Sequence, residues 1–263
     1  MEIINRRQRM FSISRKLRRE EKTVGFVPTM GALHAGHLEL VKEARQRCDI
    51  VVVSIFVNPA QFDVKADLEK YPRDLTADAA MLAEYDVDYI FAPDVEEIYP
   101  TGFSTYVDVE GLADKFEGVS RPGHFRGVAT VVTILFNTVR PDFAFFGQKD
   151  AQQVTVVRRL TGDLGFEMEI VVIPTAREES GLAMSSRNER LSPEERKKAA
   201  IIIEALREAK TTYKKGERNA ADLAEIVKNR IATEPLALVD YVGVVDRDSL
   251  QTIERIGDDE ALI

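Results

Sequence analysis

The chain has 263 residues, 44% hydrophobic and 30% charged, a composition typical of a globular protein with a substantial core. No apolar stretch reaches the ~20 residues of a membrane helix, and the basic N-terminal segment lacks the apolar region of a secretory signal. The net charge of −8 disfavours general nucleic-acid binding, and the single cysteine, Cys48, excludes an internal disulfide and indicates a reducing cytoplasm.

Short apolar stretches alternate with helical patterns through the first two thirds of the chain. Strands are predicted at residues 24–27, 50–57, 89–92, 143–147 and 169–173, and helices at residues 38–47, 75–85, 127–139 and 151–164. Continuous β-branched strands separated by helices are typical of a parallel sheet covered on both faces. The order predicts an α/β fold, a Rossmann-like doubly wound parallel sheet, over residues 1–175.

A change of pattern after Pro174 predicts a second domain, a smaller α+β unit over residues 176–263. Ser192, Pro193 and Glu195 form a typical helix start. We expect that helix to run to about residue 215. Another is expected from residue 219 or 220 to about residue 233, and a strand at residues 239–246.

Two of the three histidines, His34 and His37, lie where the first predicted strand passes into a helix. Residues three apart share a helix face, and free backbone N–H groups at a helix start attract phosphate. Gly36 between them lets a ligand approach the backbone closely. Zinc would need a third ligand, and Cys48 is expected to be a packed thiol. The pattern therefore favours a nucleotide phosphate site.

Two further segments follow predicted strands, where ligands bind in such sheets. Lys149, just after Gly147, can place its ammonium on a phosphate, although a simple capped turn explains the segment equally well. Asn58 and Gln61 flank Pro59 with amides that suit hydroxyl and carboxylate ligands, or they merely form a turn.

Three other segments carry charged or hydroxyl side chains. Residues 184–188 could bind phosphate through hydroxyls and a guanidinium, or could be only a linker. Asp74 is expected to be a helix N-cap, and a structural role is also favoured for Asp78, which could otherwise meet a metal. The loop at residues 116–127, with two arginines and the third histidine, suits anion contact or is a surface connection.

Taken together, these segments resemble the pantoate–β-alanine ligase family of the HxGH nucleotidyltransferase superfamily. The similarity runs across nearly the whole chain and is densest in PTMGALHAGH, FVNPAQF, YPRD, RPGHFRGVATVV, FGQKDAQQ and GLAMSSRN. The first motif alone indicates only the superfamily. The order of FVNPAQF, RPGHFRGV and FGQKDAQQ is specific to the family.

The resemblance implies an enzyme that condenses (R)-pantoate with β-alanine to pantothenate. ATP and pantoate would form pantoyl adenylate and pyrophosphate, and β-alanine would then release AMP. Mg²⁺ is the implied metal, with Asp78 as a candidate ligand, and the implied assembly is a cytoplasmic homodimer without nucleic-acid or membrane partners.

The resemblance also implies the site residues. His34, His37 and Lys149 would be catalytic, with His37 the family's proton donor, although we expect it to act mainly through electrostatic stabilisation of leaving pyrophosphate. Pantoate and β-alanine would be bound by Asn58, Gln61 and Gln153. The ATP site would comprise Met30, Gly31, Ala32, Leu33, His34, Ala35, Gly36, His37, Gly147, Gln148, Lys149, Asp150, Ala176, Met184, Ser185, Ser186 and Arg187, the last four in a mobile KMSKS-like loop.

One position and one short segment depart from the usual family pattern. Ser180 replaces an aspartate in the KMSKS-like loop, and residues 63–67 differ from the usual Gly-Pro-Asn-Glu-Asp. Two alternatives remain at this point. One is another HxGH nucleotidyltransferase that performs no amide ligation, and the other is a non-catalytic nucleotide- or RNA-binding module. The chain length and paired glutamines disfavour the first, and the acidic charge disfavours the second.

Overall fold

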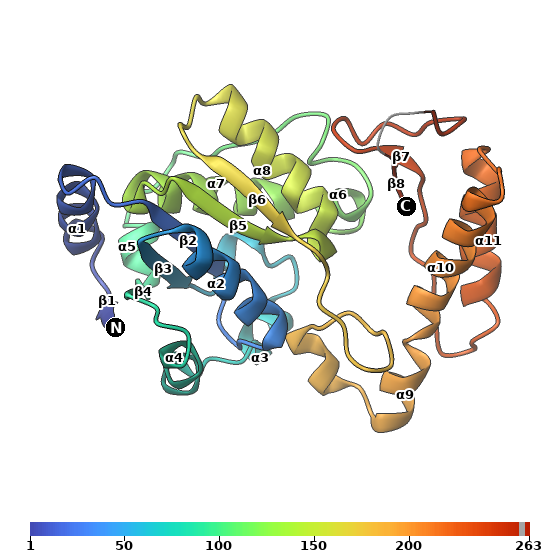
Figure 1. Ribbon diagram of the computed structural model, residues 1–263, viewed down its shortest axis with the longest axis horizontal. Helices are drawn as coiled ribbons and strands as arrows, with labels where there is room; N and C mark the ends of the chain where they lie inside the picture. The colour runs from blue at the N-terminus through green and yellow to red at the C-terminus, as the bar shows by residue number, and fades with distance from the viewer. Residues whose placement is uncertain (258–260) are drawn as a thin grey trace. The chain divides into compact units, whose positions relative to one another are not determined.

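The computed structural model describes residues 1–257 and 261–263 and divides into two compact units, Met1–Thr175 and Ala176–Ile263 (Figure 1). The strands of the first unit are β1 (Glu2–Ile4), β2 (Val24–Thr29), β3 (Ile50–Ile55), β4 (Tyr89–Phe91), β5 (Phe143–Gly147) and β6 (Glu169–Ile173). Its helices are α1 (Arg7–Arg19), α2 (Ala35–Arg47), α3 (Lys65–Lys70), α4 (Leu75–Ala83), α5 (Val95–Ile98), α6 (Glu117–Ser120), α7 (His124–Val139) and α8 (Ala151–Asp163), with 3-10 turns η1 (Pro59–Gln61) and η2 (Gln148–Asp150).

The six strands form one sheet in the order β1-β4-β3-β2-β5-β6, and every neighbouring pair is parallel. The predicted Rossmann-like sheet is confirmed. Strand order reverses between β2 and β5, and ligands bind such sheets beyond the carboxyl ends of the strands at that reversal. The segments that follow β2 and β5 contain the two histidines and Lys149, so the topology brings these candidates to one edge.

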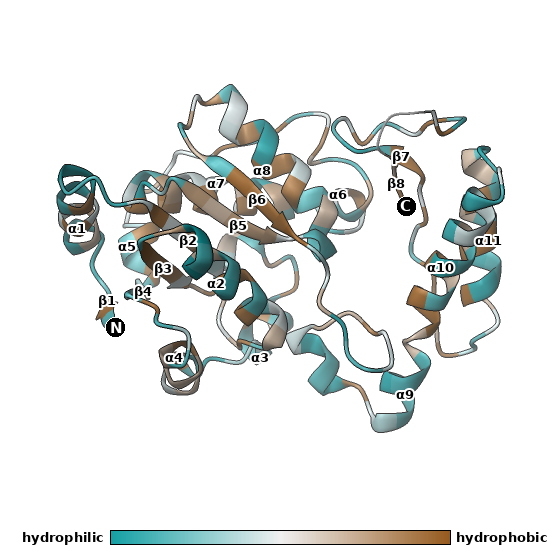
Figure 2. Ribbon diagram, in the orientation of Figure 1, coloured by the Kyte–Doolittle hydropathy of each residue, from teal (hydrophilic) through white to brown (hydrophobic). Residues whose placement is uncertain are grey.

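The central strands are largely hydrophobic (Figure 2), and their successive side chains point to opposite faces of the sheet, as the period of a strand requires. Val27 and Phe145 belong to a buried cluster with residues of α2 and α4. Their neighbours Phe26 and Phe146 instead meet the ring of Phe136 on α7, at centroid distances of 6.3 and 6.4 Å. Because both faces are covered, the strands read as continuous apolar runs.

The second unit contains α9 (Pro193–Lys198), α10 (Ile201–Lys214), α11 (Ala220–Ile231), the 3-10 turn η3 (Ser186–Arg190) and the antiparallel pair β7 (Val245–Asp246) and β8 (Ala261–Leu262). Helices α10 and α11 pack through small buried residues backed by leucine and valine: Ala205, Ala209, Ala220, Leu223, Ala224 and Val227. Small side chains allow two helices to approach closely. No helix in the described part of the chain is long and apolar enough to cross a bilayer.

Several predicted elements coincide with the structure and others differ. Residues 143–147 and 169–173 form β5 and β6 as predicted, whereas β1 and α1 were not predicted. The single helix expected from Pro193 is broken near residues 199–200, where Ile203 N–H bonds to Ala200 C=O three residues back and tightens the turn. The strand expected at residues 239–246 shrinks to Val245–Asp246 because its antiparallel partner is only two residues long.

Candidate active site

The loop that leaves β2 is held in shape by a carboxylate from α4. Gly31 and Ala32 both have positive φ, 79° and 50°, which turns the chain sharply toward α2. The backbone N–H groups of Ala32 and Leu33 donate to the two carboxylate oxygens of Asp78, at 3.1 and 2.8 Å. A Cβ added to Gly31 would lie 2.8 Å from that carboxylate, so this close approach requires glycine.

His34 and His37 together form the N-terminal cap of α2. The backbone N–H of His34 donates to Nδ1 of His37 over 3.3 Å, and the N–H of Gly36 donates to Nδ1 of His34 over 3.1 Å. A nitrogen that accepts carries a lone pair, so each neutral ring carries its hydrogen on Nε2. The cap therefore fixes both tautomers, and the rings lie 4.1 Å apart, centroid to centroid.

The same cap corrects one expectation from the sequence. We predicted free backbone N–H groups at this helix start, but the N–H of Gly36 bonds to the His34 ring and that of His37 bonds to the His34 carbonyl at 2.8 Å. The polar groups that the helix start can offer a ligand include the imidazole Nε2–H groups and the positive end of the helix dipole.

Burial keeps His37 neutral. Desolvation, followed by the positive charges of His34 and Lys149, lowers the pKa of His37 from 6.5 to about 3. A neutral imidazole donates one hydrogen bond and carries no charge at neutral pH. In this environment His37 is thus a fixed dipolar donor, and it is a poor resident source of a proton.

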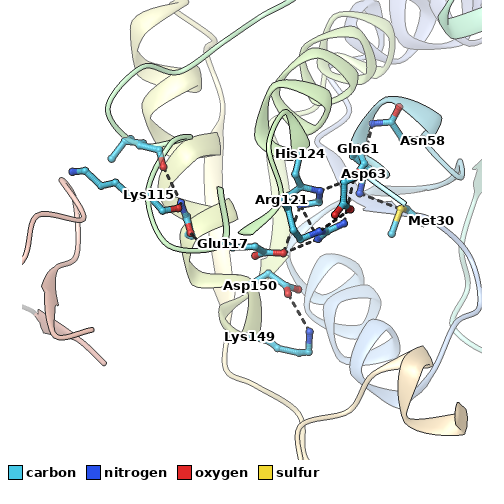
Figure 3. Close-up of polar contacts among 12 residues, drawn as sticks. Met30, Asn58, Gln61, Asp63, Lys115, Glu117, Arg121, His124, Lys149 and Asp150 are labelled. Carbon is cyan, nitrogen blue, oxygen red and sulfur yellow. Dashed lines mark hydrogen bonds and ion pairs between the residues drawn. The ribbon is translucent and has the colours of Figure 1, made fainter. Parts of the chain in front are cut away.

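Lys149 lies on η2 directly after β5, at the same sheet edge as the histidines. Its ammonium is 3.0 Å from the carboxylate of Asp150, and both side chains are largely solvated (Figure 3). An exposed pair of this kind contributes little stability. Because no strong contact immobilises it, Lys149 can move to an anionic ligand, as sequence analysis expected of a phosphate contact.

Asn58 and Gln61 form a buried polar cluster at η1. Asn58 Nδ2 donates to Gln61 Oε1 at 2.9 Å and to the Gly127 carbonyl at 3.1 Å. The Nε2 of Gln61 then faces the sulfur of Met30 at 3.1 Å (Figure 3). Asn58 is only 1% exposed, so these are interior hydrogen bonds rather than a surface turn. The structure thus joins Met30, predicted for the nucleotide site, to the predicted amide pair.

Arg121, which follows α6, and His124, the first residue of α7, both contact the backbone carbonyl of Gln61. His124 Nδ1 lies 2.7 Å from the Gln61 carbonyl, and an Arg121 nitrogen lies 3.3 Å from it. Arg121 also donates to Glu117 and to Asp63 (Figure 3). Asp63 belongs to the segment that departs from the usual family pattern. Its carboxylate accepts from Arg121 and so helps to hold that side chain against the Gln61 carbonyl.

Adjacent glutamines on α8 have different surroundings. Gln152 is buried: its Nε2 donates to the carbonyls of Leu112 and Lys115, and its Oε1 accepts from the N–H of Glu117. Gln153, the predicted pantoate residue, is half-buried on the next position of the helix. The sequence could not show that Gln152 secures the preceding loop.

The surroundings of Asp78 do not fit a protein-built metal centre. Both of its carboxylate oxygens accept backbone N–H groups, and burial raises its pKa. Within residues 1–257 and 261–263, no group of three or more His, Cys, Asp or Glu side chains could hold a metal ion. Its geometry supports the structural role that the sequence favoured and gives no support to the metal role.

The predicted KMSKS-like loop lies in the second unit. Ala176 C=O accepts from Met184 N–H at 2.9 Å, and Ser185 caps η3 by accepting from Arg187 N–H at 3.2 Å. Ser186 is the first residue of η3. At the atypical position 180, the serine hydroxyl accepts from Leu182 N–H at 3.3 Å, so this residue also supports a turn.

Tyr99 is a site neighbour that sequence analysis missed. Its hydroxyl donates to Asn58 Oδ1 at 2.7 Å across 41 residues of sequence. Nothing local marks it, since it simply follows the short helix α5.

The sequence profile of the family described as "Pantoate-beta-alanine ligase" matches residues 2–263. The chain belongs to the pantoate–β-alanine ligase family. The family relationship makes it an enzyme of the ligase class, and it decides against both alternatives that the sequence left open.

Curated relatives within the family are similar over nearly their whole length. The pantothenate synthetase of Pelotomaculum thermopropionicum is 52% identical over 242 residues, which is 92% of this chain and 86% of the relative. That of Carboxydothermus hydrogenoformans is 55% identical over 240 residues, 91% of this chain and 85% of the relative.

Solved structures of family members have the same fold. A pantothenate synthetase from Thermus thermophilus superposes with a TM-score of 0.91 at 46% identity, covering 98% of this chain and 91% of that one. A pantoate–β-alanine ligase from Francisella tularensis, complexed with beta-gamma ATP and β-alanine, gives a TM-score of 0.76 at 38% identity, covering 88% and 86% of the two chains.

Proposed function

We propose that the protein joins (R)-pantoate to β-alanine through a pantoyl-adenylate intermediate, with release of pyrophosphate and then AMP. The observation that supports this most directly is the pair of fixed imidazole donors at the β2–α2 junction, beside the buried Asn58–Gln61 amide pair. The Francisella ligase structure contains beta-gamma ATP and β-alanine, and on that basis we propose ATP and β-alanine as substrates of this chain.

The nucleotide half of the proposed site includes Met30 to His37 and Gly147 to Asp150. The Nε2–H of His37 carries no charge but offers the phosphates a hydrogen bond of fixed direction, and the His34 ring is held by the same cap. Lys149 adds a mobile positive charge. Ala176 and Met184 to Arg187 are also proposed to bind ATP, on the basis of the family resemblance.

The acid half of the site is proposed to contain Asn58, Gln61 and Gln153. Amides suit pantoate because they bind its hydroxyl and carboxylate oxygens without fixing the acid in a strong ion pair. Two anionic substrates must meet here, and alignment of the two is a large share of the required catalysis.

In the first proposed step, a carboxylate oxygen of pantoate bonds to the α-phosphorus of ATP, and the bond from that phosphorus to pyrophosphate breaks. Negative charge grows on the departing oxygens, where Lys149 and the two imidazole N–H groups stabilise it. Pyrophosphate leaves without needing a proton at neutral pH, which agrees with the neutral state of His37.

In the second step, the amine of β-alanine bonds to the acyl carbon, the bond between that carbon and the AMP oxygen breaks, and the amine proton passes to solvent. The acyl adenylate is already activated, so the protein need supply no covalent nucleophile. Gln61, placed by Asn58, is proposed to position the acyl group for this attack.

Mg²⁺ is proposed to arrive with ATP, bound through the phosphates, where it neutralises charge; it commonly binds substrate phosphates with few protein ligands. The homodimer and the cytoplasmic location stay predictions. Sedimentation of the purified protein at several concentrations tests the first.

One assay tests the reaction. The protein is mixed with ATP, Mg²⁺, pantoate and β-alanine, and nucleotide products are separated. We expect AMP, and only when pantoate is present; with pantoate but no β-alanine, pyrophosphate should appear in an amount close to that of the enzyme. Release of ADP, or AMP formation independent of pantoate, would contradict the proposal.

A further inference from the structure

The hydroxyl of Tyr99 hydrogen-bonds to the side-chain amide of Asn58. The proposed reaction gives Tyr99 no role. The 2.7 Å hydrogen bond is the shortest that Asn58 makes, since its other partners lie at 2.9, 3.1 and 3.3 Å. Burial raises the pKa of Tyr99, which keeps the phenol protonated and able to donate. The contact therefore persists over the whole pH range in which enzymes of this kind work.

The partners of Asn58 allow its amide only one orientation. Oδ1 accepts from the Tyr99 hydroxyl and from the N–H of Ala60, while Nδ2 donates to Gln61 and to the Gly127 carbonyl. A flipped amide would set N–H against the Ala60 N–H and oxygen against the Gly127 oxygen. Since the side chain is buried, water cannot relieve either mismatch.

The orientation of Asn58 in turn sets that of Gln61. Because Asn58 donates to Gln61 Oε1, the Gln61 amide presents its Nε2–H₂ at the opposite end. The partner of Nε2 there is the thioether sulfur of Met30, a weak acceptor. A strong donor facing a weak acceptor gains free energy when a ligand oxygen takes the place of the sulfur.

We propose that Tyr99 is a positioning residue that holds the Asn58 side chain in place. Asn58, oriented by the Ala60 N–H and the Gly127 carbonyl, then makes Gln61 a one-way hydrogen-bond donor to an oxygen of pantoate. The inference rests on the proposed function for the placement of pantoate at Gln61. Beyond that function, Tyr99 is the residue that secures the Asn58–Gln61 pair, and the hydrogen bond to substrate runs from Gln61 to pantoate.

Tyr99→Phe tests this with little disturbance. The ring of Tyr99 packs edge-on against Phe103 at a centroid distance of 5.0 Å and lies tilted against Phe56 at 6.3 Å, and phenylalanine retains both contacts. Loss of one hydrogen bond should raise KM for pantoate about five- to tenfold, with KM for ATP unchanged. Tyr106→Phe is the matched control, because Tyr106 packs on the same Phe103 but is half-exposed; it should leave both constants unchanged.

A double-mutant comparison separates positioning from general packing. Asn58→Ala removes the intermediary, so adding Tyr99→Phe to it should cause no further loss of pantoate affinity. Affinity is read from the rise in Tm with added pantoate, which needs no turnover. If Tyr99→Phe did not fold, Asn58→Asp would serve instead: it cannot donate to Gln61 and should weaken pantoate more than ATP.

The outcomes are distinct. An unchanged pantoate KM in Tyr99→Phe, equal effects on pantoate and ATP, or additive losses in the Asn58→Ala background would overturn this inference while leaving the ligase proposal intact. A parent protein that forms no pantoate-dependent AMP would instead overturn the proposed function.

Discussion

The backbone N–H of His34 donates to Nδ1 of His37 over 3.3 Å, so one ring begins helix α2 and is also assigned to the phosphates. The contact leaves Nε2–H as the outward donor in the neutral form. Together with its lowered pKa, this makes His37 a neutral, oriented donor rather than a charged or proton-donating group, and that state has a measurable pH signature.

The pH dependence of stability should report the neutral state of His37. Its pKa is near 6.5 in an unfolded chain and about 3 in the fold, so the unfolded chain binds the proton more readily between these values. Stability is therefore complete above pH 6.5 and falls progressively as pH drops toward 3. His37→Gln, which keeps a cap acceptor, should weaken this fall in urea titrations at pH 7 and pH 5. A parallel fall in both proteins would contradict the assignment.

Removal of charge from the phosphate site should slow the reaction strongly. We expect Lys149→Ala to lower kcat about a hundredfold, the usual loss when one stabilising group is removed from developing negative charge. Lys42→Ala on α2 is the control, since Lys42 pairs with Glu39 and lies over the Tyr85 ring, and it should retain the parent rate. Steady-state AMP formation measures both. A Lys149→Ala rate within a few-fold of the parent would exclude this role.

The Asp78 carboxylate should matter both for stability and for ATP. Asp78→Ala leaves the buried N–H of Leu33 without its acceptor, at a cost of about 1–3 kcal/mol, and removes the acceptor of the partly buried Ala32 N–H as well. The β2–α2 loop should loosen, with a lower Tm and a higher KM for ATP. Asp74→Ala removes only the N-cap of the same helix, so it should lower Tm modestly and spare the KM for ATP.

The two neighbouring glutamines of α8 should give opposite results. Gln153→Ala should raise KM for pantoate far more than KM for ATP, with Tm almost unchanged, because its side chain is predicted to contact substrate. Gln152→Ala should lower Tm, because it removes three hydrogen bonds to the 112–117 loop. Thermal melts and saturation kinetics on both variants test the pair; a pantoate effect confined to Gln152→Ala would reverse the assignment.

Local patterns in the sequence were enough to predict five of the six strands of the central sheet. Strands β5 and β6 are continuous apolar runs because both faces are covered, and such runs are visible in one dimension. The edge strand β1 has only three residues, with one buried, so no pattern could mark it. The 239–246 segment has the composition of a strand but meets a partner of only two residues.

Site residues divide in the same way. His34 and His37, like Asn58 and Gln61, are three apart, and their hydrogen bonds follow from local turns that the sequence reveals. The contacts of Asp78 with Leu33 and of Tyr99 with Asn58 span 45 and 41 residues. These groups come together only because α4 and the segment after α5 pack against the loops that follow β2 and β3. The spacing of residues along the chain therefore cannot predict these two contacts.

The cap of α2 also bears on which amino acids this position could accept. A serine or threonine followed three residues later by glutamate would start the helix equally well and is the commoner solution. The polar atoms of those side chains bond to the backbone of the helix start. An imidazole has a second nitrogen on the far side of its ring, which stays available to a ligand. Helix formation alone therefore does not account for two histidines here. Two screens should separate helix formation from ligand binding at positions 34 and 37. A screen for folding should accept Ser at 34 and Glu at 37, whereas a screen for growth without supplied pantothenate should reject them.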